Sequence, residues 1–181
     1  MRDEITQIDV STDRPKTAVL DELADVAARY GMRVVDCDDS KPWGGYIRFD
    51  GGQIEVFIEN FFPGLDLDAA RLGRRDVELS PKFLLVWPEA RLSWQRHERR
   101  AERWLYITAG GYHKSIEASD QGELKKAQPG DVVQFACGEC HRLVGDSGGR
   151  YTLVAEIWQH TDPANPSDES DIERLDDDYQ R

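Results

Sequence analysis

The stretch from Gln95 to Trp104 reads QRHERRAERW and holds three candidate metal ligands. Gln95 and His97 alternate along a predicted strand, so their side chains share one face. Glu102 follows a short polar turn that brings the chain back beside them, and His141 would complete the set from a second β-hairpin. These nitrogen and oxygen donors suit a divalent ion such as Zn²⁺, Mn²⁺, Fe²⁺ or Co²⁺ and leave positions for water or substrate.

A second motif competes for the same histidine. Residues 137–141 read CGECH, the C-x-x-C-H pattern by which c-type haem is attached to protein. That attachment usually takes place outside the cytoplasm, yet residues 1–4, MRDE, are polar and no apolar signal segment follows them. Haem would also need a sixth ligand, and the only methionine after the first is Met32. We therefore expect a divalent metal and no haem.

Composition excludes several classes of partner. The chain has 181 residues, enough for one domain with a substantial core. Its net charge of −12 argues against binding to nucleic acid or to an anionic membrane surface. Three cysteines do not describe a disulfide framework, and no apolar run has the length of a membrane span. We expect a soluble cytoplasmic protein.

Hydrophobic periodicity predicts one helix followed by many short strands. Residues 17–30 carry apolar side chains at helical spacing, and Gly31 is placed as a C-terminal stop. Residues 61–73 are ambiguous between a loop and a helical turn. Runs rich in β-formers, separated by glycine and proline turns, predict an antiparallel meander in a sandwich or small barrel. These runs cover residues 32–35, 45–49, 53–58, 82–88, 91–97, 104–108, 111–118, 131–135 and 151–159.

Several longer motifs follow one another from residue 41 to the end of the chain. They are KPWGGY at 41–46, LSWQRHERRAERW at 92–104, the segment 131–141, EIWQ at 156–159, and ESDIERL and DYQR within 169–181. Together they resemble the cupin domain of type II mannose-6-phosphate isomerases. The resemblance implies an all-β cupin fold, a double-stranded β-helix or jelly-roll barrel, with an N-terminal helix. Residues 1–40 would form a helical extension, and residues 41–181 the cupin domain with an ordered acidic tail.

The resemblance also implies a ligand set and shows some departures. The metal ligands that it carries over are Gln95, His97, Glu102 and His141. The segment between Tyr46 and Lys82 has no counterpart that we can align. Four positions differ from the family pattern: Arg103 stands where histidine is common, Ala136 where proline is usual, Gly145 where asparagine is common, and Ser170 for an acidic residue.

Arginines near these ligands are candidates for holding a phosphate. Interconversion of an aldose phosphate and a ketose phosphate requires a metal or other positive charge to stabilise an enediolate. Bidentate guanidinium contacts fix the orientation of a phosphate dianion. We expect Arg100 to be the main phosphate-binding residue and Arg174 to bind the substrate with it. Arg142 is the next candidate.

The reaction also needs a group that removes a proton next to the carbonyl. Glu156 lies on a strand expected to face the cavity and would serve as a base if burial raises its pKa. Lys114 and His113, from a neighbouring hairpin, are weaker candidates for this base, and Lys114 is also a candidate for binding the substrate. Tyr106 and Trp104 share the face of Glu102 and would form the wall of a sugar-binding cavity.

The resemblance thus predicts a metal-dependent isomerase whose partner is a small-molecule sugar phosphate, with mannose 6-phosphate and fructose 6-phosphate as the expected pair. An alternative is a cupin that binds a sugar or sugar phosphate without catalysis. A third is another metal-dependent cupin activity, such as that of an iron dioxygenase. Because cupins commonly pair through their sheets, we also expect a homodimer.

Overall fold

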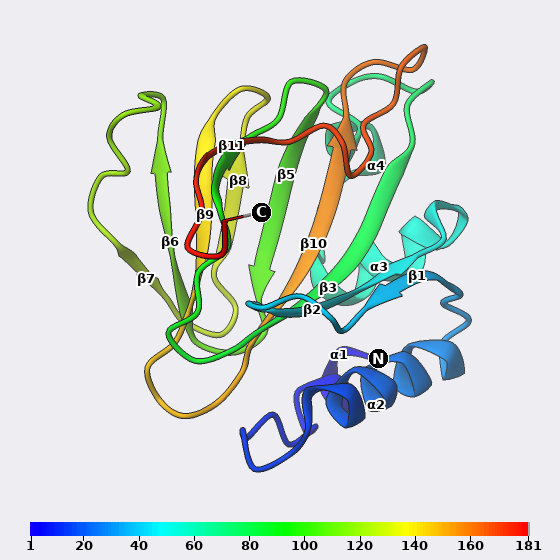
Figure 1. The fold of residues 1–181 in the computed structure, drawn as a ribbon. Coiled ribbons are helices and arrows are strands. Elements are labelled where there is room, and N and C mark those ends of the chain that lie inside the picture. Colours follow the sequence, from blue (N-terminus) through cyan, green and yellow to red (C-terminus); the bar gives the residue numbers. More distant parts are fainter. Residues whose placement is uncertain (181) are drawn as a thin grey trace.

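Two antiparallel sheets face each other, and helices cover the outer side of one of them (Figure 1). The structure is a computed structural model and describes residues 1–180; the last residue of the tail motif lies outside them. One sheet has the order β1 (Val34–Asp38), β2 (Gly44–Phe49), β3 (Leu79–Val86), β10 (Thr152–His160), β5 (Arg100–Tyr106) and β8 (Val132–Phe135). The other has the order β11 (Glu173–Asp176), β4 (Trp94–Arg96), β9 (Cys140–Gly145), β6 (Gly110–Ser115) and β7 (Lys125–Ala127). The predicted mainly-β class is confirmed.

The strand order is not that of a meander, so this part of the sequence prediction is wrong. β10 lies between β3 and β5, and β9 lies between β4 and β6. The chain therefore crosses repeatedly from one sheet to the other, as in a jelly roll. β4 and β5 do not pair, although only three residues separate them; they belong to opposite sheets. The candidate ligands before and after this turn consequently approach each other from two sheets, not from one hairpin.

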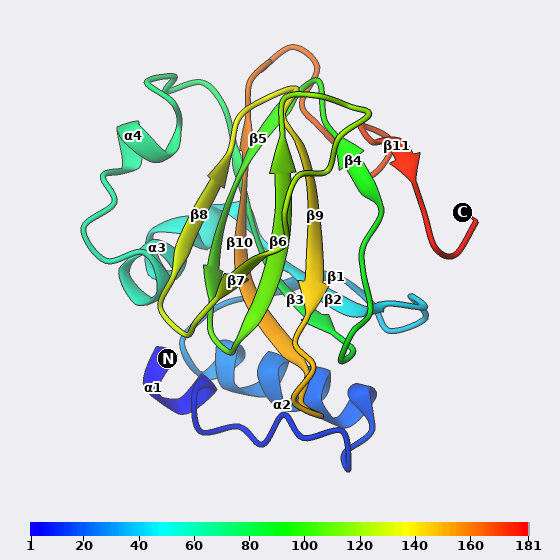
Figure 2. The ribbon, with the colours of Figure 1, turned by 90° about the vertical axis from the view of Figure 1, so that its left-hand side faces the viewer.

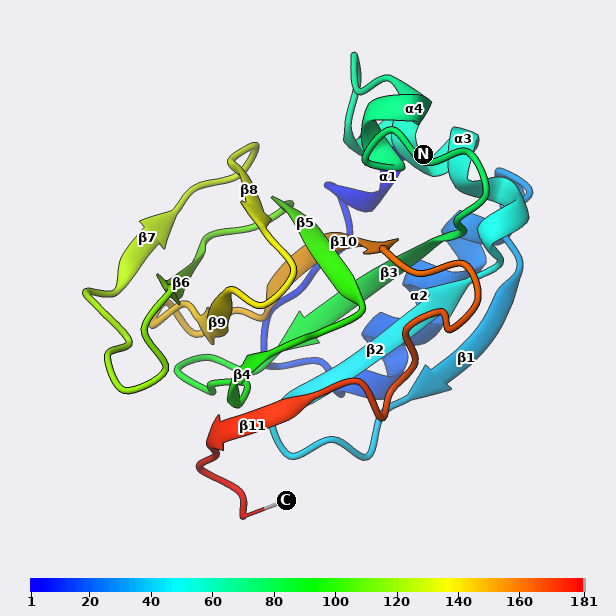
Figure 3. The ribbon, with the colours of Figure 1, turned by 90° about the horizontal axis from the view of Figure 1, so that it is seen from above.

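The helices pack against the outer face of the six-stranded sheet. They are α1 (Arg2–Ile5), α2 (Lys16–Arg29), the 3-10 turn η1 (Gly51–Gln53), α3 (Ile54–Phe61) and α4 (Leu67–Ala70). Seen from above, they lie on the side of this sheet that is remote from the five-stranded sheet (Figure 3). α2 agrees with the helix predicted at 17–30. Among residues 1–180 no helix is long and apolar enough to cross a bilayer.

Alternation along the strands divides the interior into two apolar clusters. On β10, Ala155 and Ile157 pack toward the helices, in one cluster with Phe57 and Phe83. The other cluster fills the space between the sheets and is centred on aromatic and aliphatic side chains such as Trp104. Glu156, which alternates with the helix-facing pair, therefore points between the sheets. The five-stranded sheet covers this interior from the other side (Figure 2).

Residues 53–58 form most of a helix, so the strand predicted there is wrong. Ile54, Phe57, Ile58 and Phe61 of α3 are all buried. Their spacing of three, four and seven residues places them on one face of a helix, which packs on the sheet. The high content of β-branched and aromatic residues favoured a strand, but the spacing of the buried positions decides the structure.

The acidic tail is structured, and arginines of both the interior and the surface neutralise its carboxylates. β11 pairs with β4, in the register Arg174 opposite Gln95. Arg142 is fully buried and its Nη2 lies 3.1 Å from a carboxylate oxygen of Asp176. Asp178 accepts two hydrogen bonds of 2.7 Å from the Arg91 guanidinium. Because these arginines come from the barrel, the tail is held against it, whereas its charge alone would predict disorder.

His160, at the end of β10, connects this tail to the sheet. Its Nδ1 accepts a 3.0 Å hydrogen bond from the backbone N–H of Ser167, and its Nε2 lies 3.0 Å from the Ser80 hydroxyl. Burial, with the nearby Arg100 charge, lowers the pKa of His160 to about 4. The imidazole is therefore neutral in the folded protein throughout the physiological pH range.

This depressed pKa predicts a pH-dependent stability. An unfolded histidine has a pKa of about 6.5, so between roughly pH 6.5 and pH 4 the unfolded chain binds a proton that the folded chain does not. His160 should therefore cost about 2–3 kcal/mol of stability as the pH falls through this window. Urea unfolding of wild type and His160→Gln at several pH values measures the difference. Wild type should lose more stability than the variant. Parallel pH profiles would contradict the expectation, and His113→Gln, a change at a half-buried histidine of β6, serves as the control.

Candidate metal centre

Three of the four predicted ligands meet between the two sheets. The Glu102 carboxylate lies between two imidazoles, with Oε1 at 3.1 Å from His97 Nε2 and Oε2 at 3.2 Å from His141 Nε2. The candidate ligand atoms of the three residues all lie within 4.8 Å of one another, and all three side chains are buried. β5 supplies Glu102 from one sheet, while the end of β4 and β9 supply the histidines from the other.

Gln95, the fourth predicted ligand, stands at the edge of this group. Its register partner in β9 is His141, and its Nε2 lies 3.3 Å from His97 Nε2. Its Oε1 instead accepts a 2.7 Å hydrogen bond from the Ser93 hydroxyl. A half-turn of the amide would exchange these two atoms and direct the oxygen at the histidines. Gln95 as a ligand stays a prediction.

The hydrogen bonds of the two histidines orient them as metal ligands. The Nδ1 atom of His97 contacts the carbonyl oxygen of Asp171, and that of His141 lies 3.0 Å from the carbonyl oxygen of Glu139. A carbonyl only accepts, so both Nδ1 atoms carry hydrogen and both Nε2 lone pairs face Glu102. His141 Nε2 is buried and has no hydrogen-bond partner within residues 1–180. An unpaired buried lone pair is costly, and a divalent cation between these atoms would satisfy it.

The charge states also suit a metal. Burial lowers the pKa of His97, so the imidazole is neutral. Burial alone would raise the pKa of Glu102, but its neighbours in this group hold it well below its usual range, and Arg100 is the one among them with a permanent charge. A neutral imidazole and an ionised carboxylate are the forms that coordinate divalent metals. A buried group of His97, Glu102 and His141 could therefore bind a metal ion.

Arg100 is held tightly against this group by hydrogen bonds. Its Nε donates to Glu102 Oε1 at 2.9 Å, and its Nη1 donates to the Ser167 hydroxyl at 2.7 Å. The guanidinium also lies over the Trp158 ring, 3.7 Å from its centroid. Nη2 lies 3.1 Å from His97 Nε2, the atom that a metal would take. This last contact and a metal on His97 exclude each other, so metal binding would leave Nη2 without its present partner.

A cavity adjoins the Glu102 carboxylate, and several predicted residues line it. They are Gln95, Arg100, Glu102, Trp104, Glu156 and Arg174. Trp104 forms part of the wall, as expected. Arg174 is exposed at the mouth, and no described residue forms a hydrogen bond or ion pair with its guanidinium.

Glu156 faces the cavity from β10 and is 3% exposed. Its Oε1 accepts a 2.8 Å hydrogen bond from Trp104 Nε1. Burial and the charge of Glu102 raise the pKa of Glu156 to about 8, although Lys82 and Arg100 act in the opposite direction. A carboxyl group with this pKa exchanges a proton near neutral pH, which suits acid–base chemistry.

Three predicted residues do not line the cavity. The Tyr106 hydroxyl donates to the carbonyl oxygen of Gly111 at 3.0 Å inside the apolar core. Lys114 Nζ donates to the carbonyl oxygen of Gln134 at 2.6 Å. Arg142 follows His141 on β9, so it points to the other face of the sheet, where it binds the tail. A substrate-binding role for these three residues has no support from their positions.

Sequence reasoning missed Lys82, which projects into the cavity from β3 opposite Glu156 in the sheet register. Its side chain is 3% exposed. The signal was present in the sequence, because Lys82 is the one charged residue in the run from Leu79 to Val86 that forms β3. A charged residue within a strand that is otherwise buried usually has a partner or a function.

A scan of the sequence against known protein families finds no match. No curated protein matches the sequence either. Among solved structures, a Cupin 2 conserved barrel domain protein from Salinispora arenicola CNS-205 is 17% identical over 46% of this chain and 64% of that chain, with a TM-score of 0.38. A sugar phosphate isomerase from a cupin superfamily, from Silicibacter pomeroyi DSS-3, is 18% identical over 47% of this chain and 52% of that chain, with a TM-score of 0.40.

A variant of oxalate decarboxylase from Bacillus subtilis is 12% identical over 80% of this chain and 30% of that chain, with a TM-score of 0.48. This chain thus spans less than two thirds of each of these three proteins. The structural neighbours are cupin proteins, but likenesses this distant assign no activity to this chain.

The donor arrangement predicts that metal binding depends on His141. The purified protein should retain about one divalent metal ion per chain, and a metal at about 100 times its Kd should stabilise the fold by about 2.7 kcal/mol. His141→Gln should lose most of the metal and most of the rise in Tm that added metal produces. Elemental analysis and thermal unfolding with and without chelator measure both quantities. His113→Gln is the matched control, and equal metal content in the two variants would contradict the assignment.

Proposed function

We propose that the protein is a metal-dependent aldose–ketose isomerase acting on a sugar phosphate, with mannose 6-phosphate to fructose 6-phosphate as its reaction. One observation carries the proposal: the buried carboxyl of Glu156 faces the cavity that adjoins Glu102, beside the candidate metal group. A base and a site for positive charge next to the same substrate are what enediolate chemistry requires.

In the proposed reaction Glu156 carries the proton between two carbons. Its carboxylate accepts the proton from C2 of the open-chain aldose and returns it to C1, while the O2 hydroxyl proton moves to O1. His97, Glu102 and His141, with Gln95, would hold a metal that supplies positive charge to the enediolate oxygens when bound. The pKa near 8 supports Glu156 as the proton carrier, because both of its protonation states are accessible near neutral pH.

Arginines have separate roles in the proposal. Arg174, whose guanidinium has no partner within residues 1–180, would bind the substrate phosphate at the mouth of the cavity. Arg100 lies deeper, and its Nη2 is the donor proposed for the oxygen on which charge develops. Trp104 and Trp158 would pack against the sugar as part of the cavity wall. A cytoplasmic homodimer is part of the same proposal, and its oligomeric state is accessible to light scattering.

The alternative is a cupin that binds a sugar phosphate without catalysis. The observation that favours it is the engagement of Arg100, whose Nε and Nη1 are occupied by Glu102 and Ser167. A coupled assay of mannose 6-phosphate to fructose 6-phosphate conversion, with and without chelator and across divalent metals, separates the two functions. Turnover that chelator abolishes supports the isomerase, and binding of mannose 6-phosphate with no turnover under any metal supports the alternative.

Glu156→Gln tests the proton carrier directly. The amide is close in size to the carboxyl but cannot accept the proton, so kcat should fall by about 10²–10⁴. Metal content and substrate binding should remain near those of wild type, because Glu156 belongs to neither set of ligands. Glu123→Gln, a change at an exposed glutamate, is the control and should keep full activity. Undiminished kcat in Glu156→Gln would rule out Glu156 as the base.

A further inference from the structure

An ammonium group is buried in the wall of the cavity. Lys82 Nζ lies 3.5 Å from the centroid of the Trp158 ring and 4.6 Å from that of Tyr46. Burial lowers the pKa of Lys82, and the carboxylates of Glu156 and Glu169 act in the opposite direction. The two aromatic rings offset part of the desolvation of the cation. A cation removed from water in this way still requires an anion close to it.

Glu169, in the tail, supplies that anion. Its Oε1 lies 2.7 Å from Lys82 Nζ, although the Glu169 side chain is 58% exposed and the Lys82 side chain only 3%. Within residues 1–180 no other carboxylate forms an ion pair with Lys82. Glu156 stands opposite Lys82 in the sheet but accepts its hydrogen bond from Trp104 instead. An exposed carboxylate of the tail thus neutralises a buried cation of the cavity.

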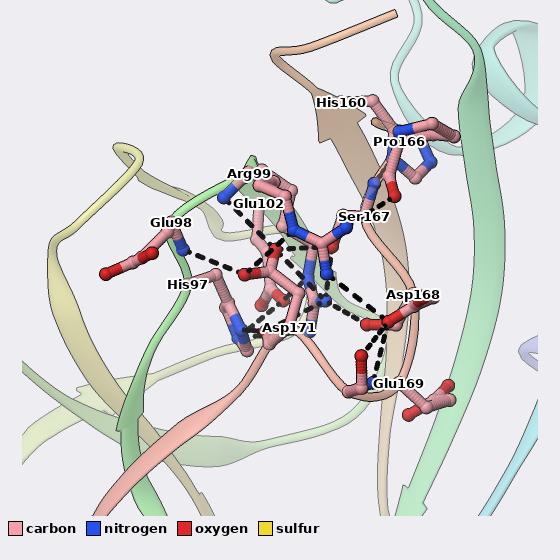
Figure 4. A network of polar contacts seen from close by, with 12 residues as sticks. His97, Glu98, Arg99, Glu102, His160, Pro166, Ser167, Asp168, Glu169 and Asp171 are labelled. Carbon is pink, nitrogen blue, oxygen red and sulfur yellow. Dashed lines mark hydrogen bonds and ion pairs between the residues drawn. The ribbon is translucent and has the colours of Figure 1, made fainter. Parts of the chain in front are cut away.

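The tail does not depend on this contact to stay in place. The Ser167 hydroxyl accepts a 2.7 Å hydrogen bond from Arg100 Nη1. The Asp171 carboxylate accepts hydrogen bonds of 3.1 Å from the backbone N–H groups of residues 98 and 99 (Figure 4). These anchors lie on either side of Glu169 in the sequence. The Glu169 side chain can therefore leave Lys82 by rotation, while the segment that carries it remains bound.

A phosphate would match this position better than a carboxylate. Glu169 contacts a single cation there, whereas Arg174 lines the same cavity with no partner among the described residues. A phosphate dianion has more charge than a carboxylate, and its oxygens can accept from an ammonium and a guanidinium together. Both cations are thus available to a phosphate group once Glu169 has moved away.

We propose that Lys82 binds the phosphate group of the substrate and that Glu169 is an internal competitor, whose carboxylate occupies the phosphate position until the substrate displaces it. This inference rests on the proposed function and names a specificity-determining residue for it. Glu169 would keep the buried Lys82 charge neutralised between turnovers, and neutral sugars would lack the anion needed to displace it.

Binding of inorganic phosphate to the metal-loaded protein, measured by titration calorimetry, tests the proposal. Glu169→Gln removes the competing charge from an exposed position, so it should bind phosphate about tenfold more tightly than wild type. Lys82→Met should lose most of the phosphate affinity. Glu173→Gln is the matched control, because Glu173 is an exposed tail glutamate that pairs with Arg96 and does not line the cavity.

Equal phosphate affinity in Glu169→Gln and Glu173→Gln would overturn the proposal, and so would wild-type affinity in a folded Lys82→Met. If Lys82→Met does not fold, as judged by circular dichroism, the comparison of the two glutamate variants decides alone. Phosphate binding is measured without turnover, so the isomerase proposal and the competitor proposal can be rejected independently of each other. If the protein has no isomerase activity but Glu169→Gln still binds phosphate more tightly than wild type, only the isomerase proposal is rejected. An active isomerase in which Glu169→Gln leaves phosphate affinity unchanged would reject the competitor only.

Discussion

The Glu102 carboxylate is the group on which the rest of the site depends. It is buried between the imidazoles of His97 and His141 and receives hydrogen bonds from Arg100 and, at 3.2 Å, from Trp104 Nε1. An uncompensated charge at this depth would cost several kcal/mol. Arg100 and Trp104 reduce that cost by donating hydrogen bonds. The Nε2 lone pairs of the two imidazoles, which come from the other sheet, face the same carboxylate, and a cation between them would satisfy all three groups. The electrostatic requirement of one carboxylate thus brings together the residues that could hold a metal.

The same requirement extends to the acidic tail. The Asp171 carbonyl orients His97, and its carboxylate binds the turn between β4 and β5. Ser167 and the carbonyl oxygen of Asp168 hold Arg100 in place. The acidic side chains of the tail thus lie against arginines and a lysine of the two sheets. The tail also supplies groups that orient His97 and Arg100, so it is part of the site. Loss of tail contacts should consequently disturb the metal group as well as the local fold.

Local patterns in the sequence predicted the helix at α2, most strands and the ligand motif, because periodicity and spacing determine which side chains share a face. Strand order could not be predicted in this way, since it depends on pairing between distant segments such as β3 and β10. The partners of Arg100 were hidden for the same reason, because Ser167 lies 67 residues away. The sequence predicted which face of its strand Tyr106 lies on, but not how far from the cavity. Tyr106 lies in the apolar core. Lys82 was detectable as a charge within an apolar strand.

We propose that the two imidazoles and the carboxylate bind a metal ion through nitrogen and oxygen donors alone. X-ray absorption spectroscopy of the zinc-loaded protein tests it most directly. We predict a first shell of nitrogen and oxygen at about 2.0–2.2 Å, with the multiple scattering of two imidazoles. A sulfur scatterer at about 2.3 Å would indicate ligation by Cys137 or Cys140 and would contradict the account. So would a shell without histidine.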